Sequence, residues 1–386
     1  MPFEKRTVME QKLGFIEQAG QISMAFSELC RQYGISRPTG YKWMHRYKQV
    51  GMKGLEELCR RPKQSPGKTL DEVEELLVAL RQEDPEWGPK KLYRLLVAMR
   101  AMGKYPFDHI PVPSTIGSIL KRRGLITDEK SQKAKAYQRF EYSFPNELWQ
   151  MDYKGEFRLD NGMNCYPLTV TDDHSRFNIV LKACRDQRHF TVQQQLTQAF
   201  REYGLPQMML SDNGPPWGTT GETLDDEDPR SITKVEKWLI RLKIKLIHGR
   251  AYHPQTQGKE ERFHRTLKNE LLNHTSFLDF TDCQFGFDKW REKYNFIRPH
   301  EALGFNTPAQ RYVPSDRSFP ERLPDLEYLQ GDILVKSDQD GRIYFKKRKF
   351  KIGRAFTNDQ LALRPGDHDG CYKVYYGDLW IKTIHL

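Results

Sequence analysis

The pattern of apolar residues changes abruptly at Leu148, and this change constrains the fold more than any other feature of the sequence. The residues before it repeat at helical spacing. After it come three short segments rich in β-forming residues, LWQMDYKGEF, CYPLTVTD and RFNIVLKA, separated by turn residues such as Asp160-Asn161-Gly162. The pattern then alternates between helix and strand: TVQQQLTQAFREYG, QMMLSD, TKVEKWLIRLK, IKLIHG and a helix in HPQTQGKEERFHRTLKNELL. These segments predict an antiparallel meander that continues into a mixed sheet covered by helices.

A meander followed by alternating helices and strands is typical of a ribonuclease-H-like α/β core, which we place at residues 146–315. Residues 330–386 contain short strand patterns with turn signals at Asp340-Gly341 and Asp369-Gly370, which predict a small β-barrel. The FKKRKFK run in this region is either a solvated strand edge or a DNA contact. The chain is therefore expected to be multidomain, with an all-α N-terminal part.

Residues 1–60 contain a helix-turn-helix pattern in FSELCRQYGISRPTGYKWMHRYKQVG. A first helix ends near Tyr33, a turn follows at Gly34-Ile35, and Ser36 begins a second helix. Leu29, Ile35, Tyr41 and Trp43 are expected to pack the helix pair together. The DNA-contacting residues expected on the second helix are Arg37, Thr39, Lys42 and Arg46. A plain helical hairpin is the alternative interpretation.

A second helix-turn-helix is predicted for residues 70–127, after a linker at 61–69. Its segments are a helix from Leu70 to Leu80, WGPKKLYRLLVAMR, and VPSTIGSILKRRGLI with a helix start at Pro113. Two such units suit an extended DNA site whose parts lie about 34 Å apart. Residues 128–145 form a basic connector able to follow phosphates. Candidate DNA contacts in this unit are Lys90, Lys91, Lys121, Arg122 and Arg123.

The net charge of +11 is concentrated at the two ends of the chain. Residues 1–145 carry 26 basic and 17 acidic side chains, whereas residues 146–310 carry 22 and 23. This distribution favours a polyanion bound by the flanks and functional acids in the middle. The six cysteines form no CxxC pair, which argues against a zinc knuckle or a disulfide framework. No apolar run is long enough for a membrane span or a signal peptide, so we expect a cytoplasmic, nucleoid-associated protein without membrane contact.

Two aspartates end neighbouring strand patterns in the middle region. Asp152 follows Trp149 and Met151 on the first strand, and Asp212 ends MMLSD. A helix that begins near Gly258 would bring a glutamate to the same edge of the sheet. Three carboxylates there would bind Mg²⁺, with Mn²⁺ as a substitute, because these hard cations prefer oxygen ligands. Two ions about 3.5–4 Å apart would suit phosphoryl transfer.

A set of ordered motifs resembles one family. MDYKGEF, LTVTDDHSRF, LSDNGPPW, HPQTQGKEERFHRTLK and YNFIRPHEALGFNTPAQRY together resemble the bacterial insertion-sequence transposases with a retroviral-integrase-type catalytic core. By this resemblance, Asp152, Asp212 and Glu261 form the catalytic acidic triad. The interval between Asp212 and Glu261 is longer than in retroviral integrases, because it includes the acidic stretch GETLDDEDPR. The helix-turn-helix units stand where retroviral integrases have an N-terminal zinc module.

The helix periodicity alone does not choose between the adjacent acids Glu260 and Glu261. Glu260 falls in line with Leu267 and Leu271, whereas Glu261 lies at the flank of that apolar stripe. The resemblance selects Glu261, because the family glutamate follows the loop glycine by three positions.

The resemblance implies a DNA transposase that binds terminal inverted repeats and catalyses strand cleavage and strand transfer. Water would first free a 3′-hydroxyl, which would then attack target DNA. The implied partners are double-stranded DNA, at the element ends and the target, and further copies of the chain on paired ends. The alternatives are a nuclease limited to hydrolysis and an inactive, transposase-derived regulator.

Other residues near the triad have two interpretations each. One interpretation is contact with the DNA end, and the other is a connecting loop or a solvated basic face. The residues concerned are Gln255, Gln257, Lys259, His264, Arg265 and Lys268. Asp172 and Asp173, in TDDHSR, are expected to have a turn role in preference to metal binding. Arg298 and His300 are expected to pack in the core.

Overall fold

A computed structural model describes residues 7–21, 24–57, 68–126, 141–212, 214, 216–217, 232–248 and 258–386. Gln255, Gln257, the stretch GETLDDEDPR and most of the connector 128–145 therefore lie outside the described residues. The chain divides into two compact units, residues 1–68 and residues 69–386.

The N-terminal unit is helical, and its helix-turn-helix is as predicted. Helix α2 (Phe26–Gln32) is followed by a turn with Gly34 in the left-handed region, and then by α3 (Arg37–Val50). The Ser36 side chain caps α3 by accepting a hydrogen bond from the Thr39 amide, and Pro38 lies in the first turn. The sequence reading missed α1 (Val8–Ala19), which begins at a capping box formed by Thr7 and Glu10. A 3₁₀ turn, Gly51–Leu55, ends the unit's described helices.

The small core of this unit is formed by Phe15 of α1 with Leu29 and Cys30 of α2. A Cβ at Gly40 of α3 would lie 2.9 Å from both Cys30 Sγ and Phe15 Cζ, so the helices approach this closely only over a glycine. Tyr41 packs the helix pair as expected but at its surface: it is 55% exposed and stacks on Phe26 of α2, with ring centroids 4.3 Å apart.

The second helical region is formed by α4 (Asp71–Glu83), α5 (Pro89–Ala101) and α6 (Pro113–Arg122). Both α5 and α6 begin with proline, whose fixed φ suits the first turn of a helix. The helices share one apolar core, whose fully buried members include Leu77, Leu92, Leu96, Ile116 and Leu120. Three helices thus occur where the helix-turn-helix pattern was predicted.

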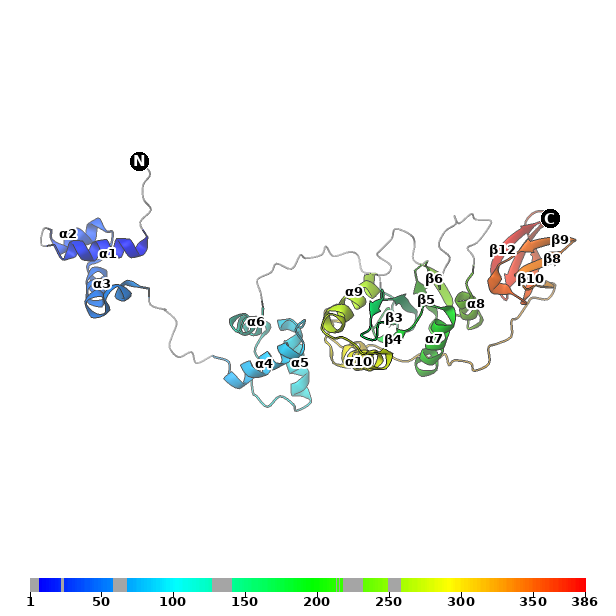
Figure 1. The fold of residues 1–386 in the computed structure, drawn as a ribbon, viewed down its shortest axis with the longest axis horizontal. Coiled ribbons are helices and arrows are strands. Elements are labelled where there is room, and N and C mark those ends of the chain that lie inside the picture. Colours follow the sequence, from blue (N-terminus) through cyan, green and yellow to red (C-terminus); the bar gives the residue numbers. More distant parts are fainter. Residues whose placement is uncertain are drawn as a thin grey trace. The chain divides into compact units, whose positions relative to one another are not determined.

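The central region contains a six-stranded mixed sheet (Figure 1). Its strands are β1 (Leu148–Tyr153), β2 (Phe157–Arg158), β3 (Asn164–Asp172), β4 (Asn178–Cys184), β5 (Met208–Ser211) and β6 (Lys245–His248). The order is β2-β3-β1-β5-β6, with β4 paired to β3. Strands β1, β3 and β4 form the predicted antiparallel meander, and β5 and β6 run parallel to β1.

Helices cover both faces of this sheet (Figure 1). On one face, α7 (His189–Tyr203) and α8 (Lys234–Arg241) pack against Trp149 and Met151 of β1. On the other, α9 (Gly258–Leu267) and α10 (Phe280–Glu292) bury Phe263, Leu267 and Phe287. A π-helical turn follows each of these two helices, at Lys268–Leu272 and Lys293–Ile297. Short 3₁₀ turns at Glu301–Leu303 and Pro308–Gln310 come next.

The C-terminal region is antiparallel β-structure. Strands β7 (Ile333–Lys336), β10 (Gln360–Pro365), β11 (Cys371–Tyr376) and β12 (Leu379–His385) form a sheet in the order β12-β11-β10-β7. Strands β8 (Arg342–Phe345) and β9 (Arg348–Lys351) form a separate hairpin, and a 3₁₀ turn at Arg354–Phe356 follows. The predicted strands are present, but across residues 330–386 they do not pair into a closed barrel.

Within the described ranges, no helix has both the length and the apolar character that a membrane span requires.

Candidate active site

Asp152 lies on the face of the sheet that α9 covers. Side chains alternate along β1, so Trp149 and Met151 enter the core under α7 and α8, whereas Gln150 and Asp152 point to the opposite face. Gln150 is 3% exposed, and Asp152 keeps 26% of its side chain exposed. The strand thus buries most of its length and leaves the aspartate at the edge of solvent.

Asp212 reaches the same level on the neighbouring strand. Strands β1 and β5 are parallel, and Gln150 pairs with Leu210, so Asp152 and Asp212 each lie two residues beyond a paired position. Asp212 Oδ1 accepts a hydrogen bond from the Gly214 amide at 3.1 Å. Partial burial raises the pKa of Asp212, and this hydrogen bond opposes the rise. The structure therefore brings the two predicted aspartates to one end of the sheet.

The first turn of α9 rests on β3 directly beside Asp152. Asp152 pairs with Thr169 in the antiparallel register, and Thr169 Oγ1 lies 3.0 Å from both Asp152 O and Glu260 Oε2. Glu260 is 1% exposed. It therefore occupies the buried face of α9 with Phe263 and Leu267, in line with the apolar stripe seen in the sequence.

Burial raises the pKa of Glu260 to about 8, with the charge of Asp152 adding to the rise and the hydroxyls of Thr171 and Thr169 opposing it. A neutral Glu260 is able to donate its proton to Thr169 Oγ1. The single hydrogen of the Thr169 hydroxyl is then left for the Asp152 carbonyl oxygen. Glu260 therefore acts as a neutral structural group beneath the aspartate.

Glu261, the next residue, is exposed, and its charge acts on Asp152. The pKa of Asp152 is raised to about 7, first by burial and then by the charges of Asp212 and Glu261, against the amide of Tyr153. The two adjacent glutamates thus have different environments: Glu260 lies inside the protein, and Glu261 faces solvent near the aspartates.

His264, one turn after Glu260, completes the polar layer between α9 and the sheet. Its Nε2 lies 2.8 Å from Thr169 Oγ1, and its Nδ1 lies 3.9 Å from Asp152 Oδ2. Burial, together with the charge of Lys154, lowers the pKa of His264 to about 4, so the imidazole is neutral at pH 7. The sequence predicted either a DNA contact or a solvated face for His264, whose side chain is 12% exposed, and it missed Thr169 because a strand threonine carries no signal of its own.

The chemistry of the donor set fits a divalent cation. Asp152, Asp212 and Glu261 offer carboxylate oxygens only, which Mg²⁺ and Mn²⁺ prefer, and a cation would relieve the repulsion that raises the Asp152 pKa. Among the residues with described positions, no three His, Cys, Asp or Glu side chains are grouped so that they could hold a metal ion. Asp152, Asp212 and Glu261 are the residues that would hold such an ion.

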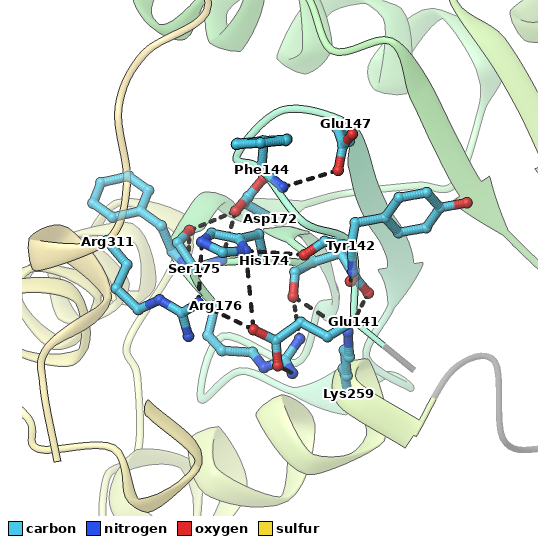
Figure 2. Close-up of polar contacts among 12 residues, drawn as sticks. Glu141, Tyr142, Phe144, Glu147, Asp172, His174, Ser175, Arg176, Lys259 and Arg311 are labelled. Atoms are coloured by element: carbon cyan, nitrogen blue, oxygen red, sulfur yellow. Dashed lines mark hydrogen bonds and ion pairs between the residues drawn. The ribbon is translucent and has the colours of Figure 1, made fainter. Parts of the chain in front are cut away.

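The TDDHSR turn between β3 and β4 has a structural role, as expected (Figure 2). Asp172 accepts hydrogen bonds from the Asn146 amide, the Ser175 amide and the Ser175 hydroxyl at 2.8, 2.8 and 2.6 Å. Asp173 forms an ion pair with Lys259 of α9 at 2.5 Å. Arg298 and His300 are buried as expected, and Arg298 Nε lies 2.9 Å from Glu270 Oε1.

The predicted DNA-contacting residues on the helices have different surroundings. On α3, Arg37 and Lys42 are exposed, Thr39 is hydrogen-bonded to Ser36, and Arg46 donates to the Glu56 carbonyl.

On α5, Lys90 is exposed and Lys91 is partly buried. At the end of α6, Arg122 and Arg123 are exposed and pair with the buried Glu74. Lys121 is exposed beside them, as are Arg265 and Lys268 on α9 and its π-helical turn.

Family comparisons assign each part of the chain. Two models described as "Integrase core domain" match residues 143–254 and 242–308. A "Homeodomain-like domain" matches residues 39–120, and the "IS481 family transposase, C-terminal domain" matches residues 332–386. The matches thus cover the helical, mixed α/β and β-rich regions in turn.

Proteins similar to this chain include a transposon protein and an insertion-element protein. The transposase for transposon Tn552 from Staphylococcus aureus is 24% identical over 98% of this chain and 83% of its own length. The uncharacterized 31.7 kDa protein of insertion element IS407 from Burkholderia multivorans is 27% identical, over 43% of this chain and 55% of its own length. Among solved structures, the HTLV-2 integrase catalytic core domain in complex with magnesium is 17% identical, with a TM-score of 0.33 over 44% of this chain and 98% of that chain.

An integrase core preceded by a homeodomain-like region and followed by an IS481-type C-terminal domain defines the architecture. The chain belongs to the insertion-sequence transposases with an integrase catalytic core.

Proposed function

We propose that the protein is an active DNA transposase that cleaves the ends of its element and joins them to target DNA. The observation that carries this proposal is the environment of Asp152 beside Asp212 at the end of parallel strands β1 and β5, where burial and then the charges of Asp212 and Glu261 raise its pKa. Strongly shifted pKa values cluster at functional sites, and a cation or a phosphate bound between the carboxylates would offset their repulsion. In this proposal the central fold is ribonuclease-H-like.

Asp152, Asp212 and Glu261 are the proposed ligands of two divalent ions. Such ions, when bound, supply Lewis-acid activation of a water or hydroxyl and stabilisation of the leaving oxygen. The chain's own residues hold the ligands in place: parallel strands β1 and β5 align the aspartates, and Thr169 braces the Asp152 backbone. His264, neutral beside Asp152, adds no positive charge that would compete with a cation.

The two N-terminal helical regions are the proposed readers of the terminal inverted repeats. Exposed Arg37 and Lys42 on α3 have the position that a recognition helix gives to base and phosphate contacts. Exposed Arg265 and Lys268 follow Glu261 on α9 and are placed to hold the DNA end beside the carboxylates. Gln255 and Gln257 remain candidates for the same DNA end, whereas Lys259 is 18% exposed and pairs with Asp173. Cutting both ends requires further copies of the chain on paired DNA, and we propose such an oligomer.

A nuclease limited to hydrolysis is the second candidate, because the same carboxylates suffice for that step. Two helical DNA-binding regions favour recognition of a long, specific site over simple degradation. The two candidates differ in one product: only a transposase joins the freed 3′ end to a second duplex.

The test uses purified protein, a labelled duplex carrying the element end and a target plasmid. Mg²⁺ or Mn²⁺ should support cleavage and joining, whereas Ca²⁺ should allow DNA binding without reaction. Asp152→Asn and Asp212→Asn should abolish both reactions and leave specific DNA binding nearly unchanged, because each substitution removes a ligand charge. Asp160→Asn, on the exposed β2–β3 turn, is the matched control and should be fully active. Joining in EDTA, or full activity of Asp152→Asn, would refute the proposal.

A further inference from the structure

Asp173 is a buried carboxylate that connects three separate segments. Its side chain is fully buried. Asp173 Oδ1 lies 2.5 Å from Lys259 Nζ of α9 and accepts a hydrogen bond from Gln150 Nε2 of β1 at 2.6 Å. Asp173 Oδ2 accepts a hydrogen bond at 2.9 Å from the amide of Tyr142, where the described chain resumes after the connector. One side chain thus joins a strand, a helix and the entry of the chain into the catalytic domain.

Two of these three contacts lie beside the proposed metal ligands. Gln150 precedes Asp152 by two residues on β1 and points to the same face of the sheet. Lys259 precedes Glu261 by two residues in the first turn of α9. The Asp173 carboxylate therefore spans the interval between the strand that carries Asp152 and the helix that carries Glu261.

The surroundings hold Asp173 rigidly in place. The Asp173 amide donates to Leu148 O at 2.9 Å, so its backbone is fixed to β1. Lys259 Nζ also donates to Asp173 O at 3.2 Å and therefore contacts both the side chain and the backbone of the turn. Figure 2 shows the adjoining charge cluster, in which Glu141 pairs with Arg176 at 3.5 Å and Arg311 at 3.2 Å. His174 Nδ1 donates a hydrogen bond to Tyr142 O at 2.9 Å, which connects His174 to the same segment as Glu141.

A single helical turn has little rigidity of its own. The first backbone amides of a helix have no partner within it, so the start of a helix is held by contacts from outside the helix. The ion pair between Lys259 and Asp173 is such a contact, because it joins the first turn of α9 to a fixed turn. Where that attachment is lost, the Glu261 backbone gains freedom, and the distance between the Glu261 and Asp152 carboxylates is no longer set.

We propose that Asp173 is a positioning residue, which through Lys259 fixes the first turn of α9 and so sets the place of Glu261 relative to Asp152. This inference rests on the proposed function, because it assigns the ion pair to the same carboxylate site. It gives Lys259 a role within the protein as the partner of Asp173. Partners that orient metal ligands change metal affinity or activity by about 10- to 100-fold when removed.

The experiment compares full-length wild-type protein with Asp173→Asn, Lys259→Gln, the double variant and Lys259→Arg. Mn²⁺ binding is measured without DNA by electron paramagnetic resonance of the free ion. The Mg²⁺ concentration for half-maximal cleavage, the DNA dissociation constant and Tm are measured in parallel. Asp332→Asn is the control, because it neutralises an equally sheltered carboxylate, 4% exposed and paired with Arg364 at 2.7 Å in the C-terminal sheet.

Each single variant should weaken Mn²⁺ binding and raise the Mg²⁺ requirement by about 10-fold or more. The double variant should be no worse than either single one, because both remove the same contact. Lys259→Arg should restore wild-type metal binding, since an arginine retains the charge that faces Asp173. DNA affinity should stay within about twofold of wild type, because the ion pair acts inside the protein. Asp332→Asn should leave the metal dependence unchanged.

Three results would overturn the inference: unchanged metal binding in Lys259→Gln, additive losses in the double variant, or a loss of DNA affinity in Lys259→Gln without a change in Mn²⁺ binding. Lys259 is 18% exposed, so its substitution keeps the test available if Asp173→Asn fails to fold. If Asp152→Asn bound Mn²⁺ as well as wild type does, the proposed function itself would be refuted. This result is different from the three above, so the two failures can be distinguished.

Discussion

At the scale of single residues, the adjacent acids Glu260 and Glu261 have different roles within one helix turn, one structural and the other proposed to bind metal. Glu260 is buried against Thr169 and is neutral over most of the physiological pH range. Glu261 is exposed, and its charge acts on Asp152. A rotation of about 100° between consecutive helical residues is enough to place one carboxyl in the polar layer and the other at the site.

The protonation of Glu260 predicts a pH-dependent stability difference. Folding raises the pKa of Glu260 from 4.5 to about 8, so its stabilising proton is fully present below pH 4.5 and is lost as the pH rises towards 8. Glutamine carries no such proton. The Tm of Glu260→Gln relative to wild type should therefore increase between about pH 5 and pH 8 in metal-free buffer, as measured by calorimetry. A Tm difference that is constant over this range would contradict the assignment.

At the scale of elements, α9 is held by two different kinds of contact. Its first turn lies on polar groups, and its middle is anchored by Phe263, which is 2% exposed and packs edge-on against Trp290 and Tyr294 at 5.6 and 5.0 Å. The polar contacts set the position of the helix start, whereas the apolar anchor supplies the stability.

Phe263→Ala should destabilise the core domain by about 3–5 kcal/mol, because it leaves a cavity between α9 and α10. Phe285→Ala is the matched control: this side chain is on α10 and is 71% exposed, so its loss should cost about 0.5 kcal/mol or less. Urea unfolding followed by tryptophan fluorescence measures both variants. Equal destabilisation by the two substitutions would show that α9 is not anchored through Phe263.

The sequence predicted the elements with strong periodicity and missed those whose pattern is interrupted. The meander, β5, β6 and α7 to α9 follow from apolar spacing, whereas α10 has Gly286 in its middle and an exposed Phe285. Gly286 is required there because a Cβ would lie 2.7 Å from Phe277 Cε1, a contact that exists only in the folded chain. The Asp173–Lys259 ion pair joins residues 86 positions apart, so the local sequence pattern could not predict it either. The two aspartates were predictable because strand ends and parallel register bring them together.

At the scale of the whole molecule, basic DNA-binding regions and an acidic site occupy different parts of the chain. Residues 1–145 carry 26 basic and 17 acidic side chains, and the proposed metal ligands all lie beyond them. Recognition of DNA and chemistry on DNA are thus separable in principle, because phosphate and base contacts need no metal ligand.

Residues 1–145, produced alone, should bind the element end in preference to scrambled DNA and should neither cut nor join it. The affinity should fall steeply with salt, because Lys and Arg contacts to phosphates release counterions. Electrophoretic mobility shifts at moderate salt measure this preference. Equal affinity for the two DNA sequences would reject the assignment of recognition to the helical regions.

The most direct test of the account compares Glu261→Gln with Glu260→Gln in strand cleavage and strand transfer, using a labelled element end and Mg²⁺. Glu261→Gln should reduce both reactions by several orders of magnitude while the protein remains folded and bound to DNA, because it removes a metal-binding charge. Glu260→Gln should stay active, since it replaces a neutral carboxyl by an amide of similar shape. An inactive Glu260→Gln beside an active Glu261→Gln would contradict the account and assign the third ligand to Glu260.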